Sequence, residues 1–238
     1  MIRAGFATSI AGALSRAVPI LFTARIVGLA VLPLVIATIV WIGIAVAGWH
    51  PLTDALAHFF GASTLSRIAA EVIAVLMFAA LAAATALTAI AVLAMPVIVR
   101  TVATRHYPSL APSRGGTFGG SLGNAAAALA VFIPLWLVSL VLLFIPPLYA
   151  VASLTLNAWL TQRMFRYDAL AEHATRDEIA IVIARGRTRL MGLGLALSPL
   201  SLIPLVNIFV LPLFGGIAFT ELCLGELEAL RAGRAGTS

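Results

Sequence analysis

Long uncharged stretches alternate with short charged connections along most of this chain. Residues 26–48 carry no charge, and Glu71 is the only charged residue in 68–99. At about 1.5 Å per residue in a helix, each stretch exceeds the roughly 30 Å of hydrocarbon in a bilayer. The pattern therefore predicts two long transmembrane helices over 26–48 and 68–99, separated by a polar connection from His50 to Arg67.

Two further apolar blocks, 125–160 and 190–224, are broken by proline. The first is interrupted by Pro134 and by Pro146–Pro147, and the second by Pro199, Pro204 and Pro212. The first block is too long for one crossing and too short for two crossings with a turn, and the halves of the second are too short to cross. Each block is predicted to be a re-entrant hairpin, which requires tight packing or oligomerisation to cover its turn.

The N-terminal residues 3–22 show a helical stripe of polar positions opposite an apolar stripe. The polar stripe holds Thr8, Ser9, Gly12, Ser15 and Arg16. A helix with one apolar and one polar face is typical of a segment lying in the membrane surface. We therefore expect 3–22 to be an amphipathic interfacial helix.

The segment 161–189 holds most of the charge in the second half of the chain. Thr175 and Glu178 have the spacing of a capping box, so a helix is predicted to begin near Arg176. Acidic residues and one histidine lie between arginines here, without a second histidine at metal-ligand spacing. The interpretation is a pair of solvated, ion-paired cytoplasmic helices rather than a metal site; the residues concerned are Asp168, Glu172, His173, Asp177 and Glu178.

Composition supports the same class. The chain has 238 residues, is 62% hydrophobic and 10% charged, and its mean hydropathy is +1.09. A soluble domain carries roughly a quarter charged residues. We therefore predict an all-α integral membrane protein that forms a single membrane domain over 1–238. The basic residues are 15 arginines without a lysine, and they flank the apolar blocks rather than forming a face interleaved with aromatics. That pattern argues against nucleic-acid binding.

The distribution of arginine predicts the topology. We consider an arrangement in which 26–48 and 68–99 cross the membrane, while each proline-broken block returns to the side from which it enters. In this arrangement 14 arginines lie on one side of the membrane, and Arg67 alone lies on the other. Four single crossings would leave the two sides nearly equal. The positive-inside rule therefore favours two crossings with both termini cytoplasmic.

Two segments are candidates for binding an anion. Arg25 stands at the predicted start of the first span, where a guanidinium and a helix N-terminus both suit an oxyanion. The glycine-rich stretch from Arg114 to Asn124 can form a nest of backbone N–H groups before a helix that starts near Asn124. Ordinary alternatives for both are a positive-inside flank and a flexible connection. Glycine pairs at 115/119, 116/120 and 119/123 also have the spacing of closely packed helices.

Several short motifs resemble one known family. They are IPLVN at Ile203–Asn207, GGIAF at Gly215–Phe219, LAVLPLV at Leu29–Val35 and NAWLTQRMFRYDALAEHA at Asn157–Ala174. Together with the two spans and two hairpins, they resemble the CysZ-type sulfate permeases, and in particular the branch with the etoposide-induced-protein domain. The resemblance implies a protein of the bacterial inner membrane that admits sulfate for cysteine biosynthesis without an ATP-binding subunit.

The same resemblance bears on the anion site. In the sulfate-permeating members a Gly-Leu-Arg-Arg sequence lies a few residues before the proline that corresponds to Pro33, and these groups bind the anion. Here the matching stretch, 23–28, contains Thr23 and a single arginine, Arg25. Arg25 and Thr23 are therefore the candidate anion-binding residues.

The leading hypothesis is a permease or channel-like path for sulfate or a related oxyanion, without a cofactor. Two spans cannot enclose a pore, so we expect a homo-oligomer. The alternative is a noncatalytic membrane scaffold or envelope-stress protein that has kept the fold and lost the anion site. An enzyme would need a buried polar cluster, which the sequence does not reveal.

Overall fold

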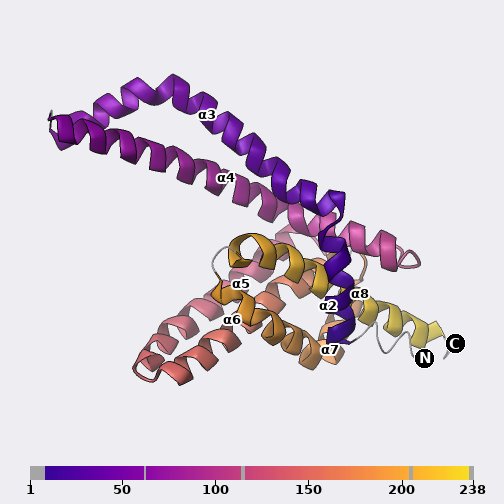
Figure 1. Ribbon diagram of the computed structural model, residues 1–238. Coiled ribbons are helices and arrows are strands. Elements are labelled where there is room, and N and C mark those ends of the chain that lie inside the picture. The colour runs from indigo at the N-terminus through magenta and orange to yellow at the C-terminus, as the bar shows by residue number, and fades with distance from the viewer. Residues whose placement is uncertain (1–8, 62, 114–115, 204–205, 236–238) are drawn as a thin grey trace. The chain divides into compact units, whose positions relative to one another are not determined.

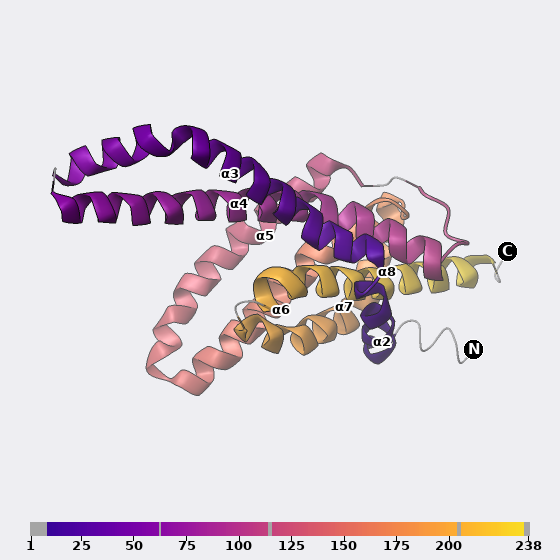
Figure 2. The ribbon, with the colours of Figure 1, turned by 45° about the horizontal axis from the view of Figure 1, so that its top comes forward.

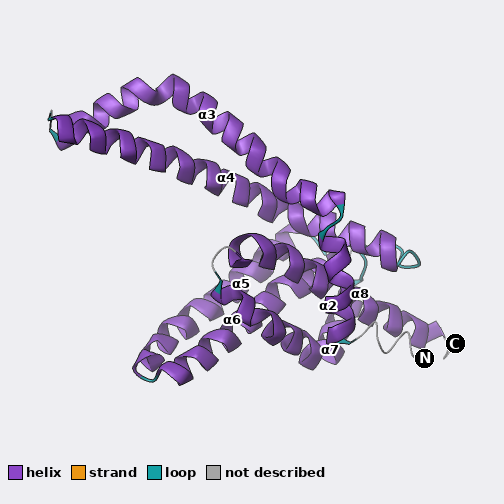
Figure 3. Cartoon of the chain, viewed as in Figure 1, coloured by secondary structure: helices purple, strands orange, loops and turns teal. Residues whose placement is uncertain are grey.

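The computed structural model describes residues 9–61, 63–113, 116–203 and 206–235, and across these ranges the chain is helical, without a strand (Figure 3). The predicted all-α class is confirmed. The α-helices of the described ranges are α2 (Ile10–Leu21), α3 (Ala24–Phe60), α4 (Thr64–His106), α5 (Phe118–Ser139), α6 (Pro146–Ala171), α7 (Arg176–Leu197) and α8 (Leu211–Ala235).

The chain divides into two compact units. One, here called the hairpin, comprises 27–93, and the other, here called the body, comprises 1–26 together with 94–238. Helix α4 begins in the hairpin and ends in the body, so the two units share a continuous helix. Each unit is described by itself below.

The hairpin consists of most of α3 and the first part of α4, joined by a sharp turn (Figure 1, Figure 2). Gly61 in this turn has φ of 92°, a conformation that a residue with a side chain rarely adopts. The polar connection predicted over 50–67 is wrong in extent, because α3 continues to Phe60 and α4 starts at Thr64. A continued helix pairs the backbone groups of these residues, apart from the N–H that Pro51 lacks. The buried Thr53 hydroxyl donates to the Trp49 carbonyl at 2.8 Å.

Large apolar side chains cover the outside of the hairpin. Val46 is 76% exposed and Ile39 is 65% exposed, and only 11% of the most apolar part of α3 and 17% of that of α4 are buried. Both helices are long and apolar enough to cross a membrane. Surfaces of this kind are stable against lipid and not against water.

In the body, α5 and α6 form a helical hairpin that reverses at a 3-10 turn over Leu140–Phe144. Pro146 and Pro147 occupy the first turn of α6, where a missing N–H costs nothing. The reversal therefore lies at the double proline, as the sequence predicts. The stretch Gly119–Phe144 is itself long and apolar enough to cross a membrane, so the re-entrant course of 125–160 stays a prediction.

Helices α7 and α8 form a second reversal through Ser198–Leu202 and Val206–Val210, and Pro204 lies outside the described residues. The predicted capping box at the start of α7 is confirmed: the Glu178 N–H donates to Thr175 Oγ1 at 3.3 Å, and the Thr175 N–H donates to Glu178 Oε2 at 2.9 Å. Helix α8 carries the centre of the body's core, where Phe219 is fully buried and stacks near Phe165 of α6.

Helix α2 corresponds to part of the interfacial helix expected over 3–22; residues 3–8 lie outside the described residues. It packs against α8 and buries Gly12, Ala13, Ala17 and Ile20. Two residues of its polar stripe do not face outward as a surface helix would require: Gly12 is buried, and Arg16 reaches a buried carboxylate on α8, whereas Ser15 is exposed.

Candidate anion site and the buried polar cluster

Arg25 and Thr23, the predicted anion-binding residues, lie at the start of α3. Arg25 is exposed in the first turn and makes no ion pair with any residue that the structure describes. The Thr23 hydroxyl donates its proton to the Ile20 carbonyl at 2.7 Å. Arg25 therefore has a free guanidinium beside a positive helix end, whereas Thr23 is engaged with its own backbone.

The glycine-rich segment 114–124 is mostly helical rather than an open nest. Helix α5 begins at Phe118, earlier than the predicted start near Asn124, because the Thr117 hydroxyl caps it by accepting from the Gly120 N–H at 3.0 Å. Of the three glycine pairs, 116/120 makes the close approach: a Cβ on Gly116 would lie 2.4 Å from the Cβ of Ala171. Residues 114 and 115 lie outside the described part of the chain.

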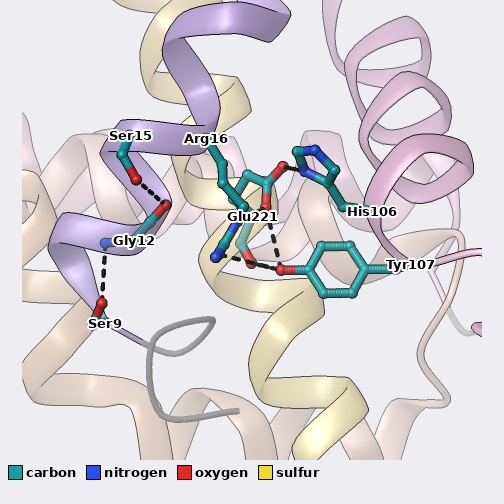
Figure 4. A network of polar contacts seen from close by, with 7 residues as sticks. All are labelled: Ser9, Gly12, Ser15, Arg16, His106, Tyr107 and Glu221. Atoms are coloured by element: carbon teal, nitrogen blue, oxygen red, sulfur yellow. Dashed lines mark hydrogen bonds and ion pairs between the residues drawn. The ribbon is translucent and has the colours of Figure 1, made fainter. Parts of the chain in front are cut away.

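A buried carboxylate in the body joins three helices. Glu221 of α8 is 0% exposed, and its Oε2 accepts from Arg16 Nε of α2 at 2.7 Å (Figure 4). The Nδ1 atom of His106, the last residue of α4, contacts Oε1. The Tyr107 hydroxyl lies 3.0 Å from the Glu221 carbonyl and 3.2 Å from Oε2. These four residues are here called the Glu221 cluster.

The Glu221 cluster is closed. Both carboxylate oxygens are engaged, and Arg16 Nη2 also lies 3.4 Å from the Tyr107 hydroxyl. Burial and the negative charge of Glu221 raise the pKa of Tyr107, so its hydroxyl stays a proton donor at neutral pH. A carboxylate at the centre repels anions. The geometry therefore suits fastening α2, the end of α4 and α8 together rather than binding an oxyanion.

Sequence reasoning did not identify this cluster. It assigned Arg16 to a surface stripe and made no use of His106, and it found no buried polar cluster. Glu221 and Arg16 are 205 positions apart, so no local spacing connects them. The available signal was Glu221 itself, the only charged residue inside the apolar block 190–224, because a buried acid requires a partner.

A second ion-pair network closes the far end of α8. Arg231 donates from Nε to Glu178 Oε1 at 3.0 Å, and from Nη2 to Glu178 Oε2 at 2.9 Å and to the His173 carbonyl at 2.7 Å. The hydrogen bond from Arg231 holds the pKa of Glu178 at about 2, against the opposing effect of burial. Glu178 therefore both caps α7 and ties it to α8.

Of the other acids of the charged segment, Glu172 has a partner outside it and Asp168 is partly buried, whereas Asp177 is exposed. Glu172 Oε1 lies 3.2 Å from Arg100 Nε of α4. Burial raises the pKa of Asp168 and lowers that of His173. The segment is thus less solvated than predicted, because α4, α5 and α8 pack around it. In the described ranges, acids, histidines and the cysteine form no group of three able to hold a metal ion.

Comparison with known proteins identifies a family. No curated protein and no solved structure matches the chain. Residues 13–212 match the family described as Sulfate transporter CysZ/Etoposide-induced protein 2.4. The matched range includes Arg16, Arg25 and His106 and ends before Glu221. Because this range is well over half of the sequence, and because the helices suit a membrane, the chain belongs to the sulfate transporter CysZ/etoposide-induced protein 2.4 family of membrane proteins.

Proposed function

We propose that this protein is a bacterial inner-membrane permease, or channel-like path, for sulfate or a related oxyanion that supplies sulfur for cysteine. The observation that carries the proposal is the family match over residues 13–212. Several charges needed to fold the body are neutralised inside it, in the Glu221 cluster and in the Glu178–Arg231 pair. A substrate anion therefore has to be attracted by arginines outside these networks.

Arg25 is the residue that we propose meets the anion first. Its guanidinium offers a planar fork of donors, and the first turn of α3 adds unpaired backbone N–H groups. Thr23, in the proposed site next to it, contributes hydroxyl lone pairs rather than a donor, because its proton is held by Ile20. In this proposal Arg25 is the main residue that binds the anion, and Thr23 contributes less to binding.

We propose a homo-oligomer, because two spanning helices do not enclose an aqueous path. The exposed apolar surface of the hairpin has to be covered by lipid or by another copy of the chain. Both termini are proposed to be cytoplasmic. Cysteine introduced at Asp177, exposed on α7, is then labelled only from the cytoplasmic side, and cysteine at His58 only from outside. Labelling of position 177 from outside overturns this topology.

Uptake of labelled sulfate into proteoliposomes tests the function. We expect uptake above that of empty vesicles by the wild-type protein, and a loss of roughly tenfold or more for Arg25→Ala, because one charge-assisted fork is removed. Arg105→Ala is the matched control: Arg105 is also exposed and without an ion pair among the described residues, but lies at the end of α4. If Arg25→Ala and Arg105→Ala reduce sulfate uptake equally, the proposed role of Arg25 is contradicted.

The second candidate is a membrane scaffold without transport. The stretch 23–28 favours it, because it holds one arginine where the sulfate-permeating relatives are expected to have two, and because Thr23 is engaged internally. Wild-type protein that gives no uptake above empty vesicles, while remaining folded and correctly inserted, favours the scaffold over the permease.

A further inference from the structure

Three arginines of the charged segment come together without a carboxylate. Arg163 and Arg166 lie three residues apart on α6 and therefore on one face of the helix. Helices α6 and α7 run antiparallel and pack closely, since a Cβ on Gly194 would lie 2.6 Å from the Ala158 carbonyl oxygen. About two turns further along each helix, Arg166 lies level with Gly186 and its neighbour Arg187.

The three guanidiniums are close enough to affect one another. Burial lowers the pKa of Arg166, and the positive charges of Arg163 and Arg187 lower it further. Even so, arginine stays protonated in proteins, so the group keeps three positive charges. Like charges held together in a partly buried place repel, and a bound anion relieves that repulsion.

The donors of this group are not satisfied by acids of the protein. Through the part of the chain that the structure describes, no ion pair reaches Arg163, Arg166 or Arg187. Glu226 of α8, close to Gly186, is occupied by Arg189. Arg166 donates to Gln162 Oε1 at 3.1 Å, which leaves most of its fork unused.

Arg163 supplies the most specific sign of a missing partner. Its Nε atom is buried and makes no hydrogen bond to the described residues, and its Cζ lies 5.4 Å from the centre of the Trp159 ring. The Asn124 side chain fixes the backbone here by donating to the Arg163 carbonyl at 3.0 Å. A buried donor without an acceptor is unfavourable, and an oxyanion provides the acceptor.

We propose that Arg163, Arg166 and Arg187 form a binding site for a tetrahedral oxyanion, a sulfate or phosphate group, between α6 and α7. This site is separate in sequence and in helix from Arg25, and binding to it does not depend on transport. The same chemistry is presented by free sulfate and by the phosphate of an anionic lipid headgroup. Guanidinium forks suit both, because their oxygens accept parallel hydrogen bonds.

The test uses the purified full-length protein in an uncharged detergent, titrated with sodium sulfate at constant ionic strength set by sodium chloride. Trp159 fluorescence is the readout, since this ring lies against Arg163, and Trp159→Phe identifies its share of the signal. We expect a saturable change, with affinity reduced roughly tenfold in Arg187→Gln and in Arg166→Gln. Arg187 is exposed, so its variant keeps the fold intact.

Arg185→Gln is the matched control, because Arg185 is exposed on the same helix and its loss removes the same charge. We expect it to leave the sulfate affinity within about twofold of wild type, because it contributes only screened long-range charge. Arg25→Ala is expected to retain the Trp159 response. The proposal is overturned if Arg185→Gln and Arg187→Gln lose sulfate affinity equally. It is also overturned if sulfate changes the Trp159 fluorescence no more than chloride does.

Nanodiscs distinguish the two sources of the anion. In phosphatidylcholine discs we expect the sulfate titration to persist. If a phosphatidylglycerol headgroup occupies the site, the Trp159 fluorescence of the wild type in phosphatidylglycerol discs is already changed before sulfate is added, and added sulfate has no further effect. The Arg166→Gln and Arg187→Gln variants do not show this initial change. If the sulfate titration is the same in phosphatidylglycerol discs as in phosphatidylcholine discs, the site binds the free ion and not the lipid headgroup. Failure of sulfate uptake by proteoliposomes bears on the transport proposal and leaves this binding result standing.

Discussion

The hairpin and the body have similar apolar helices but are stabilised differently. In the hairpin, Trp41 Nε1 donates to Thr85 Oγ1 at 3.0 Å, and an apolar pocket of about 280 Å³ lies between the helices. In the body, α8 is buried along most of 211–227, and Glu178, Glu221 and Glu226 pair with arginines from other helices. The body therefore has an internal core with specific ion pairs, whereas the hairpin depends on an apolar environment outside it.

The largest effect on this contrast is expected at Glu221. Replacing it with alanine leaves Arg16 and His106 without their shared partner, and removing one member of a buried ion pair costs about 3–5 kcal/mol. We expect a large fall in the thermal unfolding midpoint of the detergent-solubilised protein. Glu228→Ala on the same helix is the control, since among the described residues Glu228 accepts a hydrogen bond from the Ser109 hydroxyl at 3.2 Å and forms no ion pair. A fall of the same size in both variants would contradict a special role for Glu221.

Acid is expected to weaken the body through Glu178. Its folded pKa of about 2 lies below its ordinary value of 4.5, so its contribution is complete above 4.5 and is lost as the pH falls toward 2. The difference corresponds to roughly 3 kcal/mol at most. Unfolding midpoints measured between about pH 6 and pH 3 should fall in the wild type. In Glu178→Gln they should start lower and change less; parallel curves would show that other groups cause the acid effect.

The same glycine-to-alanine change should have opposite effects in the two units. A Cβ on Gly194 meets the backbone of Ala158, so Gly194→Ala should destabilise the body by about 2 kcal/mol. A Cβ on Gly43 in the hairpin has nothing within 4 Å, and alanine favours the helix by up to about 1 kcal/mol. Unfolding midpoints in one detergent measure both; equal changes would mean that the units are packed alike.

The smallest effect is expected for the hydrogen bond between the hairpin helices. A double-mutant cycle with Trp41→Phe and Thr85→Val should give a coupling of about 0.6 kcal/mol, as is usual for side-chain hydrogen bonds between membrane helices. Unfolding free energies of the two single variants and the double variant measure it. A coupling above about 2 kcal/mol would show that specific side-chain interactions stabilise the hairpin about as strongly as they stabilise the body.

Most of the fold could be predicted because its causes are local. Proline placement located both reversals of the body, and the Thr175–Glu178 spacing located the start of α7, since these effects act within a few residues. Arg25 could be chosen as a candidate for a similar reason, from its place at the start of an apolar stretch. The connection over 50–67 was misjudged, because polar residues beyond the membrane continue a helix as readily as they form a loop.

The sequence by itself determined that this is a helical membrane protein, where its main reversals lie and which family it belongs to, because hydropathy, capping and short motifs are properties of neighbouring residues. Only the tertiary structure decided that Arg16 and His106 meet Glu221, and that Arg187 comes close to Arg166 and its neighbour Arg163. The first group comes from helices far apart in the chain and the second from two consecutive helices. In both, proximity depends on how the helices pack, which no local pattern specifies.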